Sequence, residues 1–279
     1  MSLHGQLMEG LPYVEGVLNY AGQADDKPRK YASLRSARSA APAHEPHTVR
    51  IRDMRPVAEF ASLDREGFVL LNHRSAVADF SDETAIRQVY YREAERLVAQ
   101  VTGGTRVVVF DHTVRRRIEG VADRVPGAPR QPSTQIHGDY SVNSGPQRVR
   151  DIMGGEAETL LKSRFAIVNV WRPIRGPLRD APLALCDASS VAAEDWIAAD
   201  LVYGDRTGEY YLMRYRPSHH WYYVPAMRSD EVLLLKCFDS AEDARSRFVP
   251  HTAFIDPTAS TDIPPRESIE LRTFVFYES

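Results

Sequence analysis

Apolar and polar residues alternate along much of the second half of the chain, and this pattern predicts a succession of β-strands. In an extended strand, successive side chains point to opposite faces, so one buried face gives a period of two. Segments of this kind recur from Phe165 onward, at intervals of roughly ten residues between turn signals. The expected strands are residues 166–171, 183–186, 209–215, 221–224, 232–238, 252–255 and 269–277. A short helix around residues 192–201 is expected to interrupt them.

A helical period governs one segment of the first half. Its apolar positions recur at helical spacing, at Ile86, Val89, Tyr90, Leu97 and Val101. We expect a helix over residues 82–101 that lies against a sheet, with Ser81 as the N-cap and Gly103-Gly104 after its end.

Further elements are expected around this helix. Strands are predicted at residues 13–20, 48–51, 67–71 and 105–110, and a helix at 144–162 is broken in two by Gly154-Gly155. Residues 21–46 are polar and are expected to form a long loop or a mobile arm. Helices early and strands late favour a mainly β fold with flanking helices, an antiparallel sandwich or barrel.

Composition excludes several classes of partner. The net charge is −3 and the pI about 6.3, so no global basic field would recruit nucleic acid or an anionic membrane. No apolar run reaches the roughly 20 residues needed to span a bilayer, and the first residues lack the features of a signal peptide. We therefore expect a cytoplasmic protein. Cys186 and Cys237 are expected to be buried free thiols, and Arg115-Arg116-Arg117 a solvated turn.

One motif points to a metal. On a strand, His137 and Asp139 of His-Gly-Asp project from the same face, so an imidazole and a carboxylate lie side by side. His251, at the start of a late strand, can supply a second imidazole. Two histidines and one carboxylate form the facial triad that holds Fe(II) in non-haem oxygenases and leaves other coordination positions open.

The last strand carries a second signal. Arg266, fifteen residues after His251, offers a planar cation for a carboxylate such as that of 2-oxoglutarate, and Ser268 shares its face. Along the strand, Ile269, Leu271 and Val275 are apolar, whereas Ser268, Glu270 and Arg272 are polar. The polar side could face solvent, or it could face a ligand cavity; the spacing alone leaves both open.

Other histidines compete for a role as ligands. His112 is more simply explained by a core hydrogen bond or by orienting a loop. His219-His220 follows Pro217-Ser218 and is expected in a turn. Adjacent residues on a strand also point to opposite faces, so these two could not both reach one metal.

Taken together, several motifs of the chain resemble those of the CmcJ/NvfI/AsaB-type oxygenases. The shared stretches are Ser62–Phe68, Val109–Arg115, His137-Gly138-Asp139-Tyr140, Asn169–Pro173, Trp221-Tyr222-Tyr223, Lys236–Asp239, His251–Phe254 and Pro264–Glu270. They cover the chain from about residue 48. The resemblance favours a single jelly-roll oxygenase domain at 48–279, with residues 1–47 as an N-terminal strand and flexible arm that could act as a lid.

The resemblance implies a double-stranded β-helix (jelly roll, cupin-like) and Fe(II) held by His137, Asp139 and His251. It also implies 2-oxoglutarate anchored by Arg266, with O₂ as oxidant, and a small secondary-metabolite-type substrate. Oxidation of a C–H bond would yield succinate and CO₂. Because Asp139 is intact, halogenation is disfavoured. Hydroxylation, desaturation and endoperoxide formation use the same metal site and stay open.

The pocket and the alternatives complete the sequence-based predictions. Tyr140, Trp171, Arg172 and Tyr222 are expected to line the substrate pocket, and no catalytic residue is expected beyond the iron centre. A homodimer is possible. One alternative function is a 2-oxoglutarate-independent iron oxidase in which Arg266 binds a substrate carboxylate. The other is a non-catalytic jelly-roll binding protein.

Overall fold

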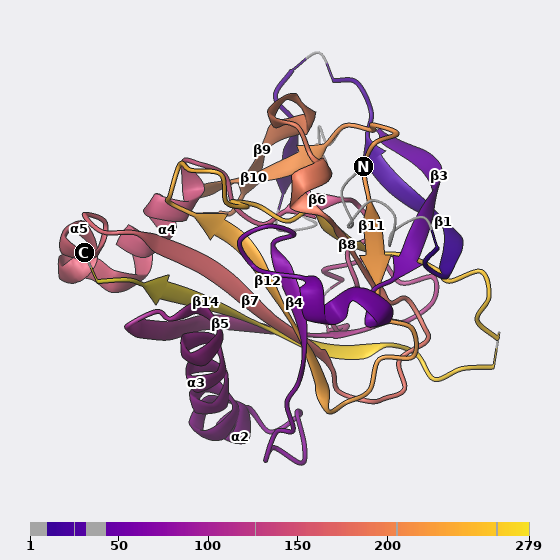
Figure 1. Cartoon of the computed structure of the whole chain (residues 1–279), viewed down its shortest axis with the longest axis horizontal. Helices are drawn as coiled ribbons and strands as arrows, with labels where there is room; N and C mark the ends of the chain where they lie inside the picture. The colour runs from indigo at the N-terminus through magenta and orange to yellow at the C-terminus, as the bar shows by residue number, and fades with distance from the viewer. Residues whose placement is uncertain are drawn as a thin grey trace.

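Two β-sheets face one another and enclose the largest group of buried side chains (Figure 1). The computed structural model describes residues 10–24, 26–31, 43–125, 127–204, 206–260 and 262–278. Within these residues most pairs of neighbouring strands are antiparallel. The mainly β fold with flanking helices that the sequence predicts is therefore confirmed.

The larger sheet has nine strands. In spatial order these are β1 (Tyr13–Ala21), β3 (His44–Asp53), β11 (Trp221–Tyr223), β8 (Leu183–Cys186), β13 (His251–Ala253), β6 (His137–Gly138), β10 (Thr207–Met213), β9 (Trp196–Val202) and β2 (Arg29–Tyr31). The pairs β3–β11 and β2–β9 are parallel. Two short inner strands, β6 and β13, lie next to each other near the middle of this sheet.

The smaller sheet has five strands. Its order is β4 (Phe68–Asn72), β12 (Glu231–Asp239), β7 (Phe165–Pro173), β14 (Glu267–Phe276) and β5 (Arg106–Arg116). Its strands extend beyond most of the predicted ranges, because residues with polar side chains at their ends still form sheet hydrogen bonds.

Alternation along β7 and β14 separates two layers of the core. On one face, Trp171 and Phe274 belong to the core between the sheets, and on the other face Val170 and Leu271 pack with the helical layer. Even-numbered residues of β14 therefore face the space between the sheets. The sequence left open whether the polar face of the last strand points to solvent or inward. In the structure it points inward, toward the space between the sheets.

A helical layer covers the outer face of the smaller sheet, beside β5 and β14 (Figure 1). It consists of α2 (Glu83–Ala85), a π-helical stretch over Ile86–Tyr90, and α3 (Tyr91–Thr102). Gly103 ends it in the left-handed conformation, φ 69°, as glycine readily does. The predicted N-cap is wrong by one residue, because the Asp82 carboxylate, and not the Ser81 hydroxyl, accepts the free backbone N–H groups of Thr84 and Ala85.

A second helical segment lies near the C-terminus of the chain (Figure 1). Here α4 (Ser144–Met153) is followed by a 3-10 turn over Gly154–Glu156 and by α5 (Ala157–Leu160), so the predicted break at Gly154-Gly155 is confirmed. The helix predicted around residues 192–201 is wrong. Only Ala193–Asp195 form a 3-10 turn, and β9 follows. Pairing of β9 with β10 on one side and β2 on the other outweighs the helix propensity of its alanines.

The N-terminal region belongs in part to the larger sheet. β1 pairs with β3 from Tyr13↔Arg52 to Ala21↔His44, so residues 44–46, predicted as loop, are strand, and so is β2. The predicted division at residues 47/48 falls inside β3. Residues 32–42 of the predicted arm lie outside the described residues.

Among the described helices, none is both long enough and apolar enough to cross a bilayer.

Candidate metal centre and co-substrate site

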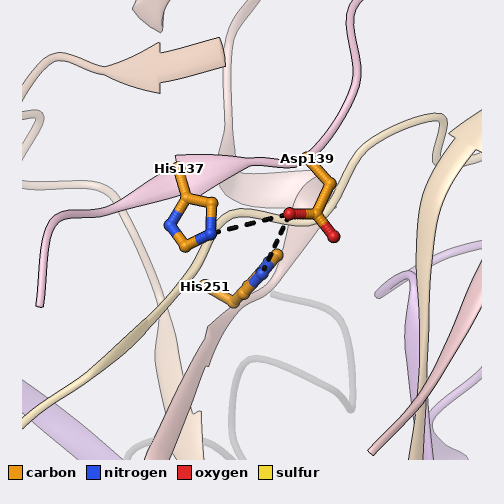
Figure 2. A group of neighbouring side chains, drawn as sticks. All are labelled: His137, Asp139 and His251. Carbon is orange, nitrogen blue, oxygen red and sulfur yellow. Dashed lines mark ion pairs between the residues drawn. The ribbon is translucent and has the colours of Figure 1, made fainter. Parts of the chain in front are cut away.

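Three side chains, two from the adjacent strands β6 and β13 and one from the residue just after β6, converge at the inner face of the larger sheet. His251 in β13 lies directly across from His137 in β6, and Asp139 follows two residues after His137. One ligand atom from each residue lies within 4.8 Å of the other two. The Asp139 Oδ1 atom is 3.6 Å from His137 Nε2 and 3.9 Å from His251 Nε2, as Figure 2 shows. A divalent ion would fit among these atoms, and the predicted triad is assembled.

Backbone hydrogen bonds fix which nitrogen of each histidine faces this centre. His137 Nδ1 lies 2.8 Å from the Gln135 carbonyl oxygen, and His251 Nδ1 lies 3.0 Å from that of Val249. A carbonyl oxygen only accepts, so each Nδ1 carries a proton, and in the neutral ring the lone pair is then on Nε2. Both rings thereby turn Nε2 toward the centre, in the arrangement usual for metal-bound imidazole.

The carboxylate is held in its ionised form. Asn169 Nδ2 donates to Asp139 Oδ2 over 2.6 Å, and Arg272 Nε lies 3.8 Å from the same oxygen. Burial alone would raise the pKa of Asp139, but Arg272, the two histidines and the Asn169 hydrogen bond together hold this pKa below its usual range. Burial, followed by the neighbouring His251, lowers the pKa of His137 to about 3. The site therefore offers two imidazoles and one ionised carboxylate, a set of ligands that suits a divalent cation.

A large cavity opens in front of the triad. Its volume is about 1050 Å³, and His137, Asp139 and Arg272 are part of its wall. α4 and the β9–β10 hairpin supply much of the remaining wall. Since ligand pockets commonly measure about 300–1,000 Å³, this cavity is large enough for a small organic substrate.

Arg266 is a buried cation without a carboxylate partner among the described residues. Its side chain is 2% exposed. Nη1 donates to the Ala181 carbonyl oxygen over 2.7 Å, Nε lies 3.1 Å from Ser268 Oγ, and the guanidinium stacks 5.0 Å from the Trp171 ring centre. The nearby Asp180 accepts from the Arg266 backbone N–H and pairs with Arg117. Burial lowers the pKa of Arg266 to about 9. A buried charge left without a counter-ion is costly, so this pocket favours an anionic ligand.

The structure places the four other predicted pocket residues in four different surroundings. Tyr140 lines the large cavity, and Trp171 lies against Arg266. Tyr222 lies in the core between the sheets, beside Phe68. Arg172 is not brought to the site. It follows Trp171 on β7 and so points to the opposite face, where Nη2 donates to the His73 and Ser229 carbonyl oxygens.

The competing histidines have structural partners instead. His112 Nδ1 is 2.7 Å from the Tyr91 hydroxyl, on the helical side of β5. His219 is buried and contacts Asp195 and the Tyr20 hydroxyl. Within the described residues, the triad is the single group of three or more such side chains arranged to hold a metal. Cys186 and Cys237 are buried free thiols, as predicted.

Sequence reasoning missed three polar residues beside the site, of which Arg115 and Arg272 line the cavity. Asn169 and Arg272 contact Asp139, and Arg115 lies across from Ser268 in the β5–β14 pair. The predicted solvated turn at Arg115–Arg117 is wrong, since Arg115 and Arg116 continue β5. Alternation from Asp111 through Thr113 to Arg115 could have shown that Arg115 shares their inward face.

Comparison with known proteins agrees with this geometry. Residues 18–276 match the family model described as "Oxidoreductase/YMDC permease-like domain". "Hydroxylase/desaturase CTB9" of Cercospora beticola is 35% identical over 255 residues, which cover 84% of this chain and 78% of that protein. "Fe(II)/2-oxoglutarate-dependent dioxygenase nvfI" of Aspergillus novofumigatus is 32% identical, covering 83% and 84% of the two chains.

A solved structure extends the similarity to three dimensions. The iron and alpha-ketoglutarate-dependent endoperoxidase NvfI superposes with a TM-score of 0.85 at 27% identity, covering 96% of this chain and 99% of that one. The jelly-roll prediction is thereby confirmed. The chain belongs to the NvfI/AsaB-type family of Fe(II)/2-oxoglutarate-dependent hydroxylases and desaturases. The prediction of a non-haem iron enzyme of this family is confirmed as well.

Proposed function

We propose that this enzyme oxidises a C–H bond of a small organic molecule bound in the 1050 Å³ cavity, by hydroxylation or desaturation. Fe(II) is held by His137, Asp139 and His251, and 2-oxoglutarate is consumed with O₂ to give succinate and CO₂. The names of the relatives support a substrate of the secondary-metabolite type.

The observation that carries the co-substrate assignment is the buried guanidinium of Arg266. Its Nη2 atom has no hydrogen-bond partner among the described residues, while Nη1 and Nε are already oriented by Ala181 and Ser268. A carboxylate at this position would form a charge-assisted hydrogen bond and supply the missing counter-charge. The Ser268 hydroxyl lies where it can donate to the same carboxylate.

The side chains around the triad have distinct roles. His137 and His251 present their Nε2 lone pairs because the backbone retains their Nδ1 protons. Asn169 and Arg272 engage Oδ2 of Asp139 and so turn Oδ1 toward the histidines. Iron, 2-oxoglutarate and O₂ together supply the oxidising power for C–H cleavage. The protein binds these components in one geometry and keeps the ligands deprotonated.

The test is oxidation of 2-oxoglutarate without added substrate. Purified enzyme with Fe(II), O₂ and 2-oxoglutarate should form succinate slowly, because these enzymes turn over without substrate at a low rate. A matched reaction without Fe(II) and one with Asp139→Ala should give none. Binding of 2-oxoglutarate without succinate would indicate a binding protein. If the protein neither binds 2-oxoglutarate nor forms succinate but oxidises another compound, it is a 2-oxoglutarate-independent oxidase.

A further inference from the structure

The wall of the large cavity carries a group of cations that the triad and Arg266 do not use. They come from three segments: Lys30 on β2, Arg115 on β5, and Arg124 and Arg130 on the loop after β5. Arg266 is not part of this wall. Within the group, Arg115 adjoins the proposed 2-oxoglutarate anchor, because it lies across from Ser268 in the β5–β14 pair and its charge lowers the pKa of Arg266, whereas Lys30 comes from the other sheet.

Among the described residues, the acids near these cations are fewer than the cations. The Asp123 carboxylate lies among these cations. Arg130 donates to both of its oxygens, from Nε over 2.8 Å and from Nη2 over 3.0 Å. Arg124 Nε lies 3.6 Å from the same carboxylate. Further along, Glu270 pairs with Arg272. Among the described residues near this group, the four cations thus outnumber the two carboxylates, Asp123 and Glu270, and Glu270 is already paired with Arg272.

Lys30 and Arg115 have no carboxylate in ion-pair range among the described residues. Lys30 is half-buried on its short strand across from Leu201. Arg115 Nη1 donates to the Gln131 carbonyl oxygen over 2.7 Å, and this neutral bond orients its guanidinium without balancing its charge. Burial lowers the pKa of both side chains. The neighbouring Arg124, Arg115 and Arg130 lower the pKa of Lys30 further, against the opposing effect of Asp123. Glu270 and Asp123 raise the pKa of Arg115, but burial, Arg130 and Arg272 together outweigh them.

The acids on the neighbouring wall are already engaged. Asp200 lies 2.5 Å from Lys27 Nζ, and Glu209 lies 2.6 Å from the same nitrogen. Glu209 also accepts from Ser141 and Asn143. Neither carboxylate is free to move across the cavity without breaking these contacts. An anion from outside the protein is the simplest counter-charge for Lys30 and Arg115.

We propose that Lys30 and Arg115 form a subsite for a carboxylate carried by the substrate. This inference rests on the proposed function and narrows it, because it makes the substrate an organic acid. Arg115 offers a planar fork that matches a carboxylate, and Lys30 adds a point charge. With the acid group held here, another part of the molecule extends along the same cavity toward His137 and Asp139. Lys30 and Arg115 would thereby determine which C–H bond of the substrate faces the metal.

The experiment uses benzoate as an anionic probe and benzamide as its neutral counterpart. Enzyme loaded with Fe(II) and saturating 2-oxoglutarate under nitrogen is titrated calorimetrically with each compound. Benzoate should bind and benzamide should bind at least about tenfold more weakly, because one charge-assisted contact contributes a factor of this order. Lys30→Met and Arg115→Gln should each weaken benzoate binding by about tenfold or more.

Matched variants control for general charge effects. Lys162→Met and Arg87→Gln remove exposed cations outside the cavity and should leave benzoate affinity unchanged. Circular dichroism should show that Arg115→Gln is folded, and Lys30→Met, on an edge strand, gives an independent test. Equal binding of benzoate and benzamide, or unchanged affinity in both cavity variants, would overturn the proposal.

A further readout separates this proposal from the proposed function. The visible absorption of the Fe(II)–2-oxoglutarate complex is followed during the titration. If benzoate removes this absorption, or if Lys30→Met and Arg115→Gln abolish it, the cations hold 2-oxoglutarate itself and the substrate subsite is rejected. If wild-type enzyme never develops the absorption, the proposed function fails, whereas the calorimetric comparison still reports on the subsite.

Discussion

Single atoms determine what the metal centre can bind. Each histidine commits Nδ1 to a backbone carbonyl two residues earlier in the chain, Gln135 for His137 and Val249 for His251. This repeated local contact follows from the extended backbone on which both residues lie. It orients the rings at 53° to each other with centroids 4.4 Å apart, so both Nε2 atoms face one point. The site is preorganised without its ion.

The role assigned to Arg266 is tested by removing its charge. Arg266→Gln keeps a polar side chain but loses the cation, and we expect 2-oxoglutarate to bind the Fe(II) enzyme about tenfold to a hundredfold more weakly. The metal ligands are untouched, so affinity for the metal alone should not change. Equilibrium titration of each ligand provides the two measurements.

Arg175→Gln is the matched control for that experiment. Arg175 is an exposed arginine just beyond β7, paired with Glu267. Its replacement should leave 2-oxoglutarate affinity at the wild-type value. If Arg266→Gln also binds 2-oxoglutarate normally, the carboxylate is held elsewhere and the anchor assignment is wrong.

At this scale the sequence predicted the ligands better than their surroundings. The His-x-Asp spacing on a strand and the position of His251 depend on local geometry that any β-strand imposes. Arg172, in contrast, was expected in the pocket with Trp171, although neighbours on one strand face opposite sides. Asn169 and Arg272 contact Asp139 across sheet pairings that no local pattern reveals.

At the scale of elements, α4 forms a wall of the cavity because one of its residues is a glycine. A Cβ on Gly145 would lie 2.5 to 2.8 Å from three ring carbons of Phe238 in β12. Helix and sheet therefore approach to a distance that only glycine permits. Ser144, Gln147 and Arg148 of α4 reach the cavity as a result.

Gly145→Ala should therefore destabilise the protein. Overpacking of this kind costs about 1–3 kcal/mol, more than the gain of roughly 1 kcal/mol from better helix propensity. Denaturant unfolding measures the difference in free energy. Gly155→Ala serves as the control, because a Cβ there meets nothing within 4 Å, and its stability should be unchanged or slightly higher. Equal stability of the two variants would show that α4 can shift away from Phe238.

The sequence predicts the strands whose residues form apolar or alternating runs. It does not predict the strands that form only by pairing with a neighbouring strand. β7, β12 and β14 appear in the sequence as apolar or alternating runs. β2 is three residues long and polar, and it exists only because it pairs with β9. β9 itself was predicted as helix. Its conformation is decided by partners far away in the chain.

At the scale of the whole molecule, the two sheets bring together groups that are distant in sequence. His137 and His251 are cross-strand neighbours in one sheet, whereas Asn169 and Arg272 approach Asp139 from the other. The site therefore forms only when the sheets are packed. An ion bound there would link β6 to β13, and unfolding would release it.

Metal binding should accordingly stabilise the fold. Saturation with Mn(II), used as an air-stable substitute for Fe(II), should raise the unfolding temperature, and a chelator should reverse the change. At a free metal concentration of 100 times Kd the stabilisation is about 2.7 kcal/mol. Differential scanning fluorimetry provides the measurement. If Mn(II) raises the unfolding temperature of Asp139→Ala as much as that of wild type, the ion binds elsewhere.

Two properties of the whole molecule stay predictions. A lid role for the N-terminal arm depends on residues 32–42, which lie outside the described residues, and a homodimer depends on a partner chain. A cytoplasmic location likewise rests on the sequence. The cation-rich part of the cavity could not have been predicted, because Lys30, Arg115 and Asp123 meet only through the packing of the larger sheet against β5.

The central claim is that His137, Asp139 and His251 together bind one Fe(II) that is chelated by 2-oxoglutarate. The most direct measurement is the visible absorption that develops when Fe(II) and 2-oxoglutarate are added to the protein under nitrogen. Wild type and His112→Ala, whose histidine contacts Tyr91 on the helical side of β5, should both develop this metal-to-ligand band. His251→Ala should lose it. A band of normal intensity in His251→Ala would contradict the assignment of the third ligand, and with it the proposed site.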